Sequence, residues 1–349
     1  MKHFLKSESG IALLLVLWVL MLLMVIVGEF CHAMRTEVNI TRNFKEDTQS
    51  YYIAVAGLNR AVSELIKNEI LPQKVKSPDS EDDDEEADEE EISWRINADI
   101  PAIAFGEGQF EVKIGNESGK VNINRANRRL LRMMLNGFDL DDSDKDVIVD
   151  SILDWRDKDR NHRISGAEDD YYDSLPEPYE CKDGDFDSIE ELLLVRGVTP
   201  EIFYGGLEHM VTVYQDETKS RGRRGRGKKG FDYDKVNVNT APPQVLRSLP
   251  MMTDDLVQEI IEYRKEQDFK SMAALSDIVG PDVFQTIAKH ITMETCAYYT
   301  IKSVGTLEGS QTKQGVEALI KIDTTLRKGY RVIKWLDALR YPVCRSDHR

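Results

Sequence analysis

Cysteine and histidine are scarce in this chain of 349 residues, and neither occurs in a pattern typical of zinc binding or catalysis. The four cysteines form no CxxC pair and show no Cys/His spacing of a zinc site. The six histidines belong to no Ser/His/Asp, Cys/His or metal-hydrolase pattern. We therefore expect a protein that is not an enzyme.

The cysteines leave room for one disulfide. Cys31 lies at the end of a long apolar segment, whereas Cys181, Cys296 and Cys344 lie beyond it. If the part of the chain that carries these three residues is exported, two of them can pair in an oxidising compartment. The sequence does not select which two.

Charge is abundant but unevenly placed. The net charge is -16, and residues 81–91 hold ten carboxylates in eleven positions. Such a run repels itself and buries nothing, so we expect a solvated acidic loop over 78–91. Residues 219–229 hold seven basic residues and three glycines, which predicts a linker over 219–230. The acidic balance argues against a nucleic-acid partner.

The long apolar segment covers seventeen residues, 11–27, which is near the lower limit for spanning a bilayer. No small-residue cleavage site follows it, which disfavours an ordinary secretory signal. SESG at residues 7–10 resembles instead a type IV prepilin leader, which prepilin peptidase cleaves after the glycine. The resemblance implies removal of residues 1–10 after Gly10, a new N-terminus at Ile11, and a transmembrane helix over 11–30. An uncleaved signal anchor is the alternative.

One residue departs from the pilin pattern. Most pilins carry glutamate at mature position five, where it pairs with the N-terminal amine of a neighbouring subunit. This chain has Leu15 there. A carboxylate inside a bilayer is costly and is usually functional, so its absence is informative. A subunit with Leu15 lacks the usual partner for a subunit ahead of it.

The apolar pattern continues with helical spacing after the membrane segment. Its members are separated by three, four or seven residues: Ile40, Phe44, Tyr51, Val55, Leu58, Val62 and Leu65. This spacing places them on one face of a helix, which Pro72 ends. We predict one helix from about residue 11 to 70, half in lipid and half packed on a domain. A membrane-proximal coiled coil is the alternative.

The middle of the chain contains an internal repeat. VNINRA at 121–126 matches VNVNTA at 236–241, ILDWR at 152–156 matches IIEYR at 260–264, and 186–192 matches 269–275. The offset falls from 108 to 83 after the second match, which locates an insertion of about 25 residues in the first copy. The copies resemble helix-hairpin-helix modules. The expected hairpin at 249–253 has no glycine or lysine, so we expect no DNA binding through it.

The insertion begins with DKDRNHRISGAE at 157–168, which has the oxygen spacing of an EF-hand loop. The predicted calcium ligands are Asp157, Asp159, Asn161, the carbonyl of Arg163, Ser165 and Glu168, with Asp169 and Asp170 able to share a second ion. His162 replaces the usual loop glycine. We predict one or two Ca²⁺ ions within 157–187, against the alternative of a solvated acidic loop.

Strands flank the helical repeats on both sides. Polar and apolar residues alternate over 92–96, 109–114, 298–304, 315–322 and 330–336, as in half-buried strands. We therefore predict an α+β protein, with a pilin-like long helix on an antiparallel sheet and a large all-α domain inserted. The expected parts are 31–118 (pilin helix and first strands), 119–294 (inserted helical domain) and 295–349 (last strands).

GAEDDYYDSLPEPY at 166–179, SIEELLLVRGVT at 188–199 and VNVNTAPPQVL at 236–246 together resemble minor pseudopilin K of the type II secretion system, the GspK family. The resemblance spans nearly the whole chain. It implies a calcium-binding subunit at the tip of a periplasmic pseudopilus, anchored in the inner membrane by one helix. It also implies assembly with the I-type and J-type minor pseudopilins and then the H-type, and contact with the inner-membrane secretion platform. A membrane-tethered DNA-binding protein and a type IV pilus minor pilin are the alternatives.

Overall fold

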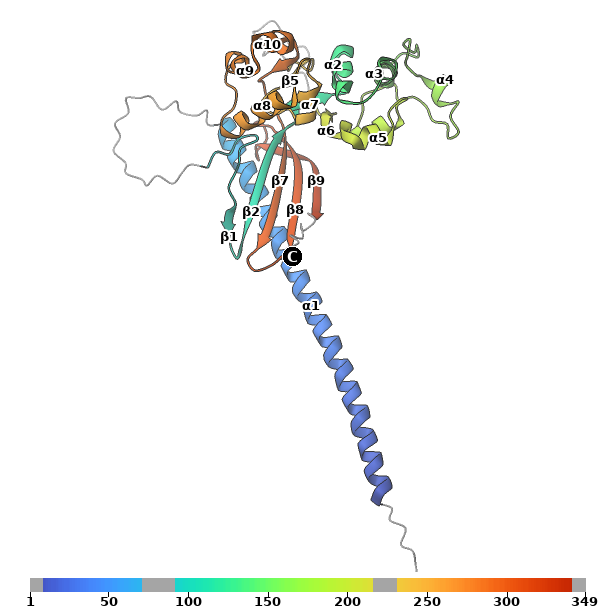
Figure 1. Cartoon of the computed structure of the whole chain (residues 1–349), viewed down its shortest axis with the longest axis vertical. Coiled ribbons are helices and arrows are strands. Elements are labelled where there is room, and N and C mark those ends of the chain that lie inside the picture. The colour runs from blue at the N-terminus through green and yellow to red at the C-terminus, as the bar shows by residue number, and fades with distance from the viewer. Residues whose placement is uncertain (1–8, 71–91, 216–230, 341–349) are drawn as a thin grey trace, which may run out of the picture.

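A single long helix organises the N-terminal part of the structure. The computed structural model describes residues 9–70, 92–215 and 231–340, and helix α1 covers Ser9–Ile70. The predicted acidic loop, the basic linker and Cys344 lie outside the described residues. In the part of the chain that is described, α1 alone is long and apolar enough to cross a membrane. Its first half projects from the molecule (Figure 1), and the prediction of one helix that is only half packed on a domain is confirmed. The predicted packed face begins later than expected, because Ile40 and Phe44 are exposed.

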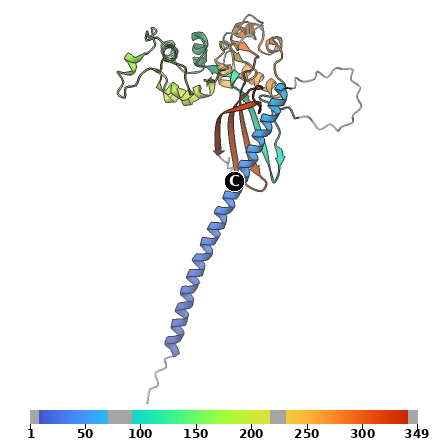
Figure 2. The same ribbon diagram turned by 180° about the vertical axis from the view of Figure 1, so that it is seen from behind.

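Five antiparallel strands form the sheet on which the second half of α1 packs (Figure 2). Their order is β1-β2-β7-β8-β9, with bounds β1 Ile103–Phe105, β2 Gly108–Asn116, β7 Tyr298–Leu307, β8 Lys313–Ile322 and β9 Tyr330–Arg340. Side chains from α1 and from one face of the sheet form a continuous core that includes Leu58, Val62, Phe110, Ile301 and Ala318. The α+β prediction is therefore confirmed.

Four of the five predicted strands are present, but the segment 92–96 is not a strand. It runs in irregular backbone into a turn at Asn97, whose φ is 57°. Its alternation has another cause, because Trp94 is buried in the core while Arg95 donates to the carbonyl of Arg264, 2.7 Å away. Strand β1 was not predicted, since only three residues pair there.

Two glycines let α1 approach the sheet closely. A Cβ placed on Gly305 of β7 would lie 2.1 Å from the carbonyl oxygen of Ser50 and 2.6 Å from the nitrogen of Ala54, both in α1. A Cβ on Gly57 of α1 would lie 2.5 Å from Oγ of Ser303. The backbone of α1 therefore packs directly on the backbone of β7, with no side chain between them.

The helical domain is inserted between β2 and β7. Its larger elements are α2 Arg128–Met134, α3 Asp142–Arg156, α5 Pro200–Ile202 and α6 Glu208–Met210 in the first repeat, and α7 Pro243–Ser248, α8 Asp254–Glu266, α9 Met272–Val279 and α10 Pro281–Ile287 in the second. Each repeat closes with a two-residue parallel pair. These pairs are β3 Val121–Asn122 with β4 Val211–Thr212, and β5 Val236–Asn237 with β6 Ile291–Thr292.

The same asparagine pairing occurs in both repeats and confirms the alignment of the copies. Asn124 accepts from the backbone nitrogen of Phe186 at 2.7 Å and donates to its carbonyl at 2.9 Å. Asn239 does the same to Phe269, at 2.8 and 3.1 Å. In each repeat the asparagine side-chain amide makes the two backbone hydrogen bonds that a neighbouring strand would make to the phenylalanine. This pair of bonds holds the phenylalanine in the same position in both repeats.

An arginine completes each copy. Arg264 donates to the carbonyls of Val238 and Ala241, both at 2.9 Å, and is 4% exposed. Arg156 donates to Ile123 and, at 2.8 Å, to Ala126. Burial lowers the pKa of Arg264 to about 10, so the group remains charged at neutral pH. Each guanidinium joins the end of a helix to the VNxN turn.

Replacing Arg264 with alanine should lower the free energy of unfolding by about 2–4 kcal/mol, because two buried carbonyls lose their donor. Arg156→Ala should cost less, since the first copy leaves its arginine half-buried. Urea unfolding of both variants measures the difference. If Arg264→Ala lowers the free energy of unfolding by less than about 0.5 kcal/mol, the two hydrogen bonds of Arg264 do not stabilise the fold.

Candidate metal centre

The insertion leaves the first repeat at Arg156 and returns at Phe186. It contains one short helix, α4 Asp169–Tyr172. An aromatic cluster packs against this insertion. Tyr172, which is fully buried, stacks on Tyr179 with ring centroids 5.2 Å apart, and its ring meets that of Trp155 edge-on at 5.3 Å. This packing brings the chain after α4 back beside the residues before it.

Glu168 is the central acidic residue of this region. It is 2% exposed, and neither carboxylate oxygen has a nitrogen or oxygen donor among the described residues; its neighbour is the weakly donating Cys181 thiol. The same holds for Oδ1 of Asp183. Ligand atoms of Glu168, Cys181 and Asp183 lie within 4.8 Å of one another. A buried carboxylate without a donor is costly unless a cation or a proton neutralises it.

The pKa values of the cluster reflect this cost. Burial is the main cause that raises the pKa of Glu168 to about 7; the Cys181 thiol opposes the shift, and the carboxylates of Asp154 and Asp183 add to it. Burial also raises the pKa of the Cys181 thiol to about 12, so this sulfur is protonated at neutral pH. The two carboxylates of the cluster offer the hard oxygen ligands that Ca²⁺ takes in proteins.

The predicted loop ligands lie in several different environments. Asp157 accepts from Arg163 at 2.6 Å, and the same guanidinium reaches the fully buried Asp154. Asp159 is exposed and accepts from Asn161, at 2.9 Å from both the backbone and the side-chain nitrogen. Asp157 and Asp159 thus have partners within the loop.

The remaining predicted ligands are also separated. The carbonyl of Arg163 accepts from the nitrogen of Gly166 at 3.1 Å, and the nitrogen of Ser165 lies 3.4 Å from Asp150. Asp169 accepts from the backbone of Cys181 at 2.8 Å, and Asp170 is exposed. Of the predicted set, the structure places only Glu168 in the buried cluster.

Asp183 and Cys181 lie in this cluster but were not among the predicted ligands. Asp183 falls within the segment 157–187 in which the ions were predicted, while Cys181 and the nearby Asp154 carry no metal-binding signal in the sequence. The donor set fits a divalent cation held by Glu168 and Asp183, because their orphaned oxygens need a positive charge. Asp154 is less available, since it already pairs with Arg163.

The residues predicted for processing and assembly all lie on α1. Gly10 and Ile11 belong to its first turns, and Leu15 is 60% exposed. Cys181 and Cys296 are not bonded to each other. Cys344 lies outside the described residues, so a disulfide of Cys344 with Cys181 or Cys296 stays a prediction.

Comparisons with known proteins agree with this architecture. The family described as "Type II secretion system (T2SS), protein K" matches residues 110–216, and the helix-hairpin-helix motif family matches 232–292. Type II secretion system protein K of Aeromonas hydrophila is 23% identical over 288 residues, covering 78% of this chain and 80% of that protein.

A solved structure has the same fold. The GspK-GspI-GspJ complex of the enterotoxigenic Escherichia coli type 2 secretion system contains a chain that matches with a TM-score of 0.52 and 15% identity, covering 85% of this chain and 99% of that one. The first repeat is thus similar to the type II secretion system protein K family, the relative from Aeromonas hydrophila is similar over most of the chain, and the solved structure shares the fold.

Proposed function

We propose that this chain caps the periplasmic end of a type II secretion pseudopilus, with α1 as its one membrane span in the inner membrane. The observation that carries the proposal is the position of the helical domain. It lies at the end of the sheet opposite to the projecting half of α1 (Figures 1 and 2). Another subunit stacked ahead would have to occupy the space that this domain fills.

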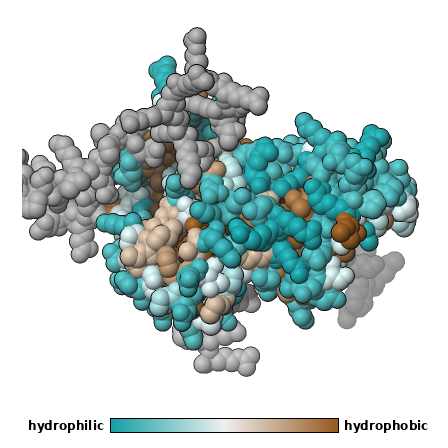
Figure 3. Space-filling model, turned by 90° about the horizontal axis from the view of Figure 1, so that it is seen from above, coloured by the Kyte–Doolittle hydropathy of each residue, from teal (hydrophilic) through white to brown (hydrophobic). Residues whose placement is uncertain are grey.

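The N-terminal segment supports the same position. Pilin-like subunits join through their long helices, and the usual contact between neighbours uses a glutamate at the place of Leu15. An apolar residue there leaves the amine of a subunit ahead without a carboxylate. The upper face of the helical domain suits a free end in water, because the first-repeat side is mostly hydrophilic (Figure 3).

The proposal includes partners and a maturation step. Prepilin peptidase removes residues 1–10, and the exposed half of α1 then packs against the helices of the I-type and J-type minor pseudopilins and later the H-type. This assembly starts the fibre on the inner-membrane platform, and the fibre helps export folded proteins. The similar solved structure is a complex of GspK with GspI and GspJ, which supports the I and J partners.

Calcium forms part of the proposal as a structural ion. Glu168 and Asp183 would hold it, and its charge would neutralise two carboxylates that lack donors. The ion would fix the insertion against the aromatic cluster.

Crosslinking tests the tip position. Single cysteines at Leu14, Leu15 and Val16, in a chain with Cys31→Ser, should crosslink in membranes to subunits whose helices lie on the basal side only. The measurement is the identity and register of each crosslinked partner by mass spectrometry. Equally frequent crosslinks to a subunit displaced toward the outer membrane would exclude a tip position, while leaving the family resemblance untouched.

A further inference from the structure

Large apolar side chains continue along one side of α1 beyond the membrane segment. They form two rows with spacings of four or eight residues, which keep each row on one side of the helix. The first row is Phe30, Met34 and Val38, and the second is Ile40, Phe44 and Tyr52, each between 49 and 72% exposed. The side chains between the two rows are those of Ala33, Glu37, Thr41 and Lys45. We call this side of residues 30–52 the stalk face.

The stalk face points away from the sheet of its own chain. A Cβ on Gly305 of β7 would meet the backbone of Ser50, so the side of α1 at Ser50 is the one that packs on the sheet. Eighteen residues make five turns of an α-helix, so Met34 lies on the same side as the exposed Tyr52, and His32 lies on the same side as Ser50. The sheet side of the projecting helix is polar: His32, Arg35, Asn39 and Asn43. The pilin part of this chain therefore cannot cover the stalk face.

The bilayer does not cover it either. The apolar run ends at Val27, and at 1.5 Å per residue Phe44 lies about 25 Å beyond this point and Tyr52 about 37 Å beyond it. Residues 11–30 already fill a hydrocarbon core of about 30 Å. Above Tyr52 the same side of the helix turns polar, with Asn59 and Ser63 exposed. The stalk face is thus an apolar surface in water with a defined upper end, which marks an interaction site.

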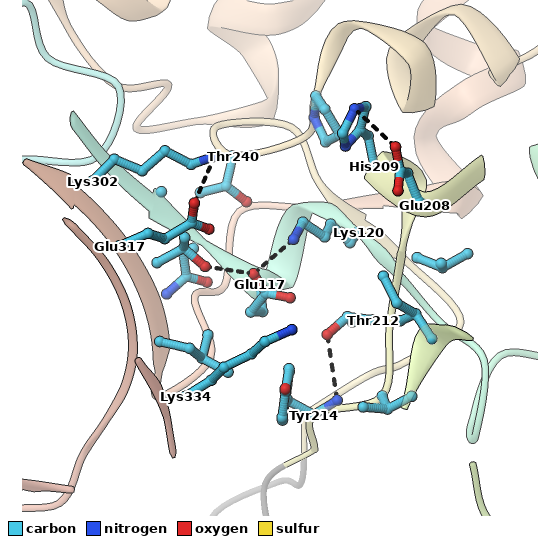
Figure 4. Close-up of a pocket in the computed structure, with 18 of the residues that line it drawn as sticks. Glu117, Lys120, Glu208, His209, Thr212, Tyr214, Thr240, Lys302, Glu317 and Lys334 are labelled. Carbon is cyan, nitrogen blue, oxygen red and sulfur yellow. Dashed lines mark hydrogen bonds and ion pairs between the residues drawn. The ribbon is translucent and has the colours of Figure 1, made fainter. Parts of the chain in front are cut away.

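The main concave surface of the described residues has a different character. A cavity of about 740 Å³ lies between the outer face of the sheet and the first repeat (Figure 4). Charged side chains in it pair within the chain, Lys120 with Glu117 at 2.8 Å and Lys302 with Glu317 at 3.0 Å. The stalk face instead exposes apolar side chains that no described residue covers.

We propose that the stalk face binds the helix of one neighbouring membrane-anchored subunit, which likewise continues beyond its own membrane segment. The face runs along a helix that projects straight from the domain (Figure 1), so a second helix anchored in the same membrane can follow it over its whole length. Such a partner would place a basic residue against Glu37 and an acidic residue against Lys45, since both charges lie within the face.

The inference rests on the proposed function, because it takes α1 as a membrane span and other minor pseudopilins as partners. It adds the side of α1 that is used and the height at which the contact ends. The polar side at Asn39 and Asn43 stays in water, so between Phe30 and Tyr52 this chain takes one neighbouring helix.

Photo-crosslinking tests the direction of the contact. The residue p-benzoylphenylalanine is placed in the full chain, in cells that also make the I-type and J-type minor pseudopilins. At Phe44 or Tyr52 it should link to the helix of an I-type or J-type subunit at least about fivefold more often than at Asn43, which lies at the height of Phe44 on the polar side. At Ser63, above the face, it should give no such link.

Equal yields at Phe44 and Asn43 would overturn the proposal, as would links from Phe44 to lipid or to a second copy of this chain. A link from Phe44 to a subunit displaced toward the outer membrane would exclude the tip position and still support the stalk face. The two proposals therefore fail separately.

Phe44→Glu should reduce the amount of I-type and J-type subunit that co-purifies with the chain in detergent at least about tenfold, because a carboxylate then lies in an apolar contact. Asn43→Glu is the matched control: it adds the same carboxylate at the next residue, on the polar side, and should change the amount less than about twofold. Both positions are exposed, so both variants should keep the fold, which circular dichroism checks. Equal losses in the two variants, or no loss in either, would contradict the proposal.

Discussion

Calcium should raise the melting temperature of the chain by at least about 5 °C when present at a hundred times its Kd, and Glu168→Gln with Asp183→Asn should abolish the rise. The two residues contribute buried oxygens that have no donor in the described structure. Their negative charge destabilises the metal-free fold, and a bound cation removes that cost. Differential scanning fluorimetry with calcium and with chelator measures both effects.

The variant has a second signature. In chelator it should melt at the same temperature as the parent chain or higher, because the amides remove a buried repulsion. Asp159→Asn is the matched control, since this carboxylate is exposed and already accepts from Asn161. The buried cluster predicts that the control keeps the calcium effect, whereas the EF-hand-like set predicts its loss. If chelator changes the melting temperature of none of these chains, the site is wrong.

The pH dependence follows from the raised pKa of Glu168. Its pKa is about 7 in the folded, metal-free chain and near 4.5 in the unfolded one, so folding favours the protonated form. The contribution of this group to stability is therefore greatest below pH 4.5 and falls by about 3 kcal/mol as pH rises to 7. Calcium competes with the proton, and its affinity should fall about tenfold per unit below pH 7. Glu168→Gln should remove both trends.

Replacing Gly305 with alanine should destabilise the pilin part of the molecule by at least about 3 kcal/mol. The new Cβ would lie 2.1 Å from the carbonyl oxygen of Ser50, so either α1 or β7 must move. The contact is with backbone, which cannot rotate away, and overpacking of a core usually costs 1–3 kcal/mol even where side chains can adjust. Urea unfolding followed by tryptophan fluorescence, to which Trp94 in the same core contributes, reports the change.

Gly115→Ala provides the comparison on a neighbouring strand. A Cβ there meets only the carbonyl oxygen of Thr300, at 3.7 Å, which is an ordinary contact. The two variants add the same methyl group and lose the same glycine flexibility, so their difference isolates the helix contact. Equal unfolding midpoints would mean that α1 does not lie against β7 at Gly305.

Sequence reasoning identified the elements that depend on local periodicity. The apolar spacing in the second half of α1 and the alternation in β2, β7 and β8 each reflect one buried face, and a buried face leaves its period in the sequence. The alternation in β9 predicted a strand, although its described side chains lie at the exposed edge of the sheet. The prediction of a strand at 92–96 was wrong. The alternation there arises because one side chain, a tryptophan, packs in the core and the next, an arginine, reaches the helical domain. A period of two therefore does not require a strand partner.

The metal centre was predicted less well, because it depends on contacts between distant residues. Glu168 meets Asp183 only because the aromatic cluster around Tyr172 turns the chain back after α4. The spacing of acids in 157–168 indicates an ion but does not show that Arg163 lies against two of them. Competition between a guanidinium and a cation for the same carboxylates leaves no signal in one sequence.

The two repeats differ mainly in what lies between the arginine and the returning phenylalanine. In the first repeat 29 residues separate Arg156 from Phe186, and in the second four residues separate Arg264 from Phe269. The same asparagine and arginine bonds close both gaps. The two repeats therefore keep the same bonds whether or not a long loop is present, which makes this junction a place where evolution can add or remodel a loop such as residues 157–185. The second repeat shows the same hydrogen bonds in the absence of the loop.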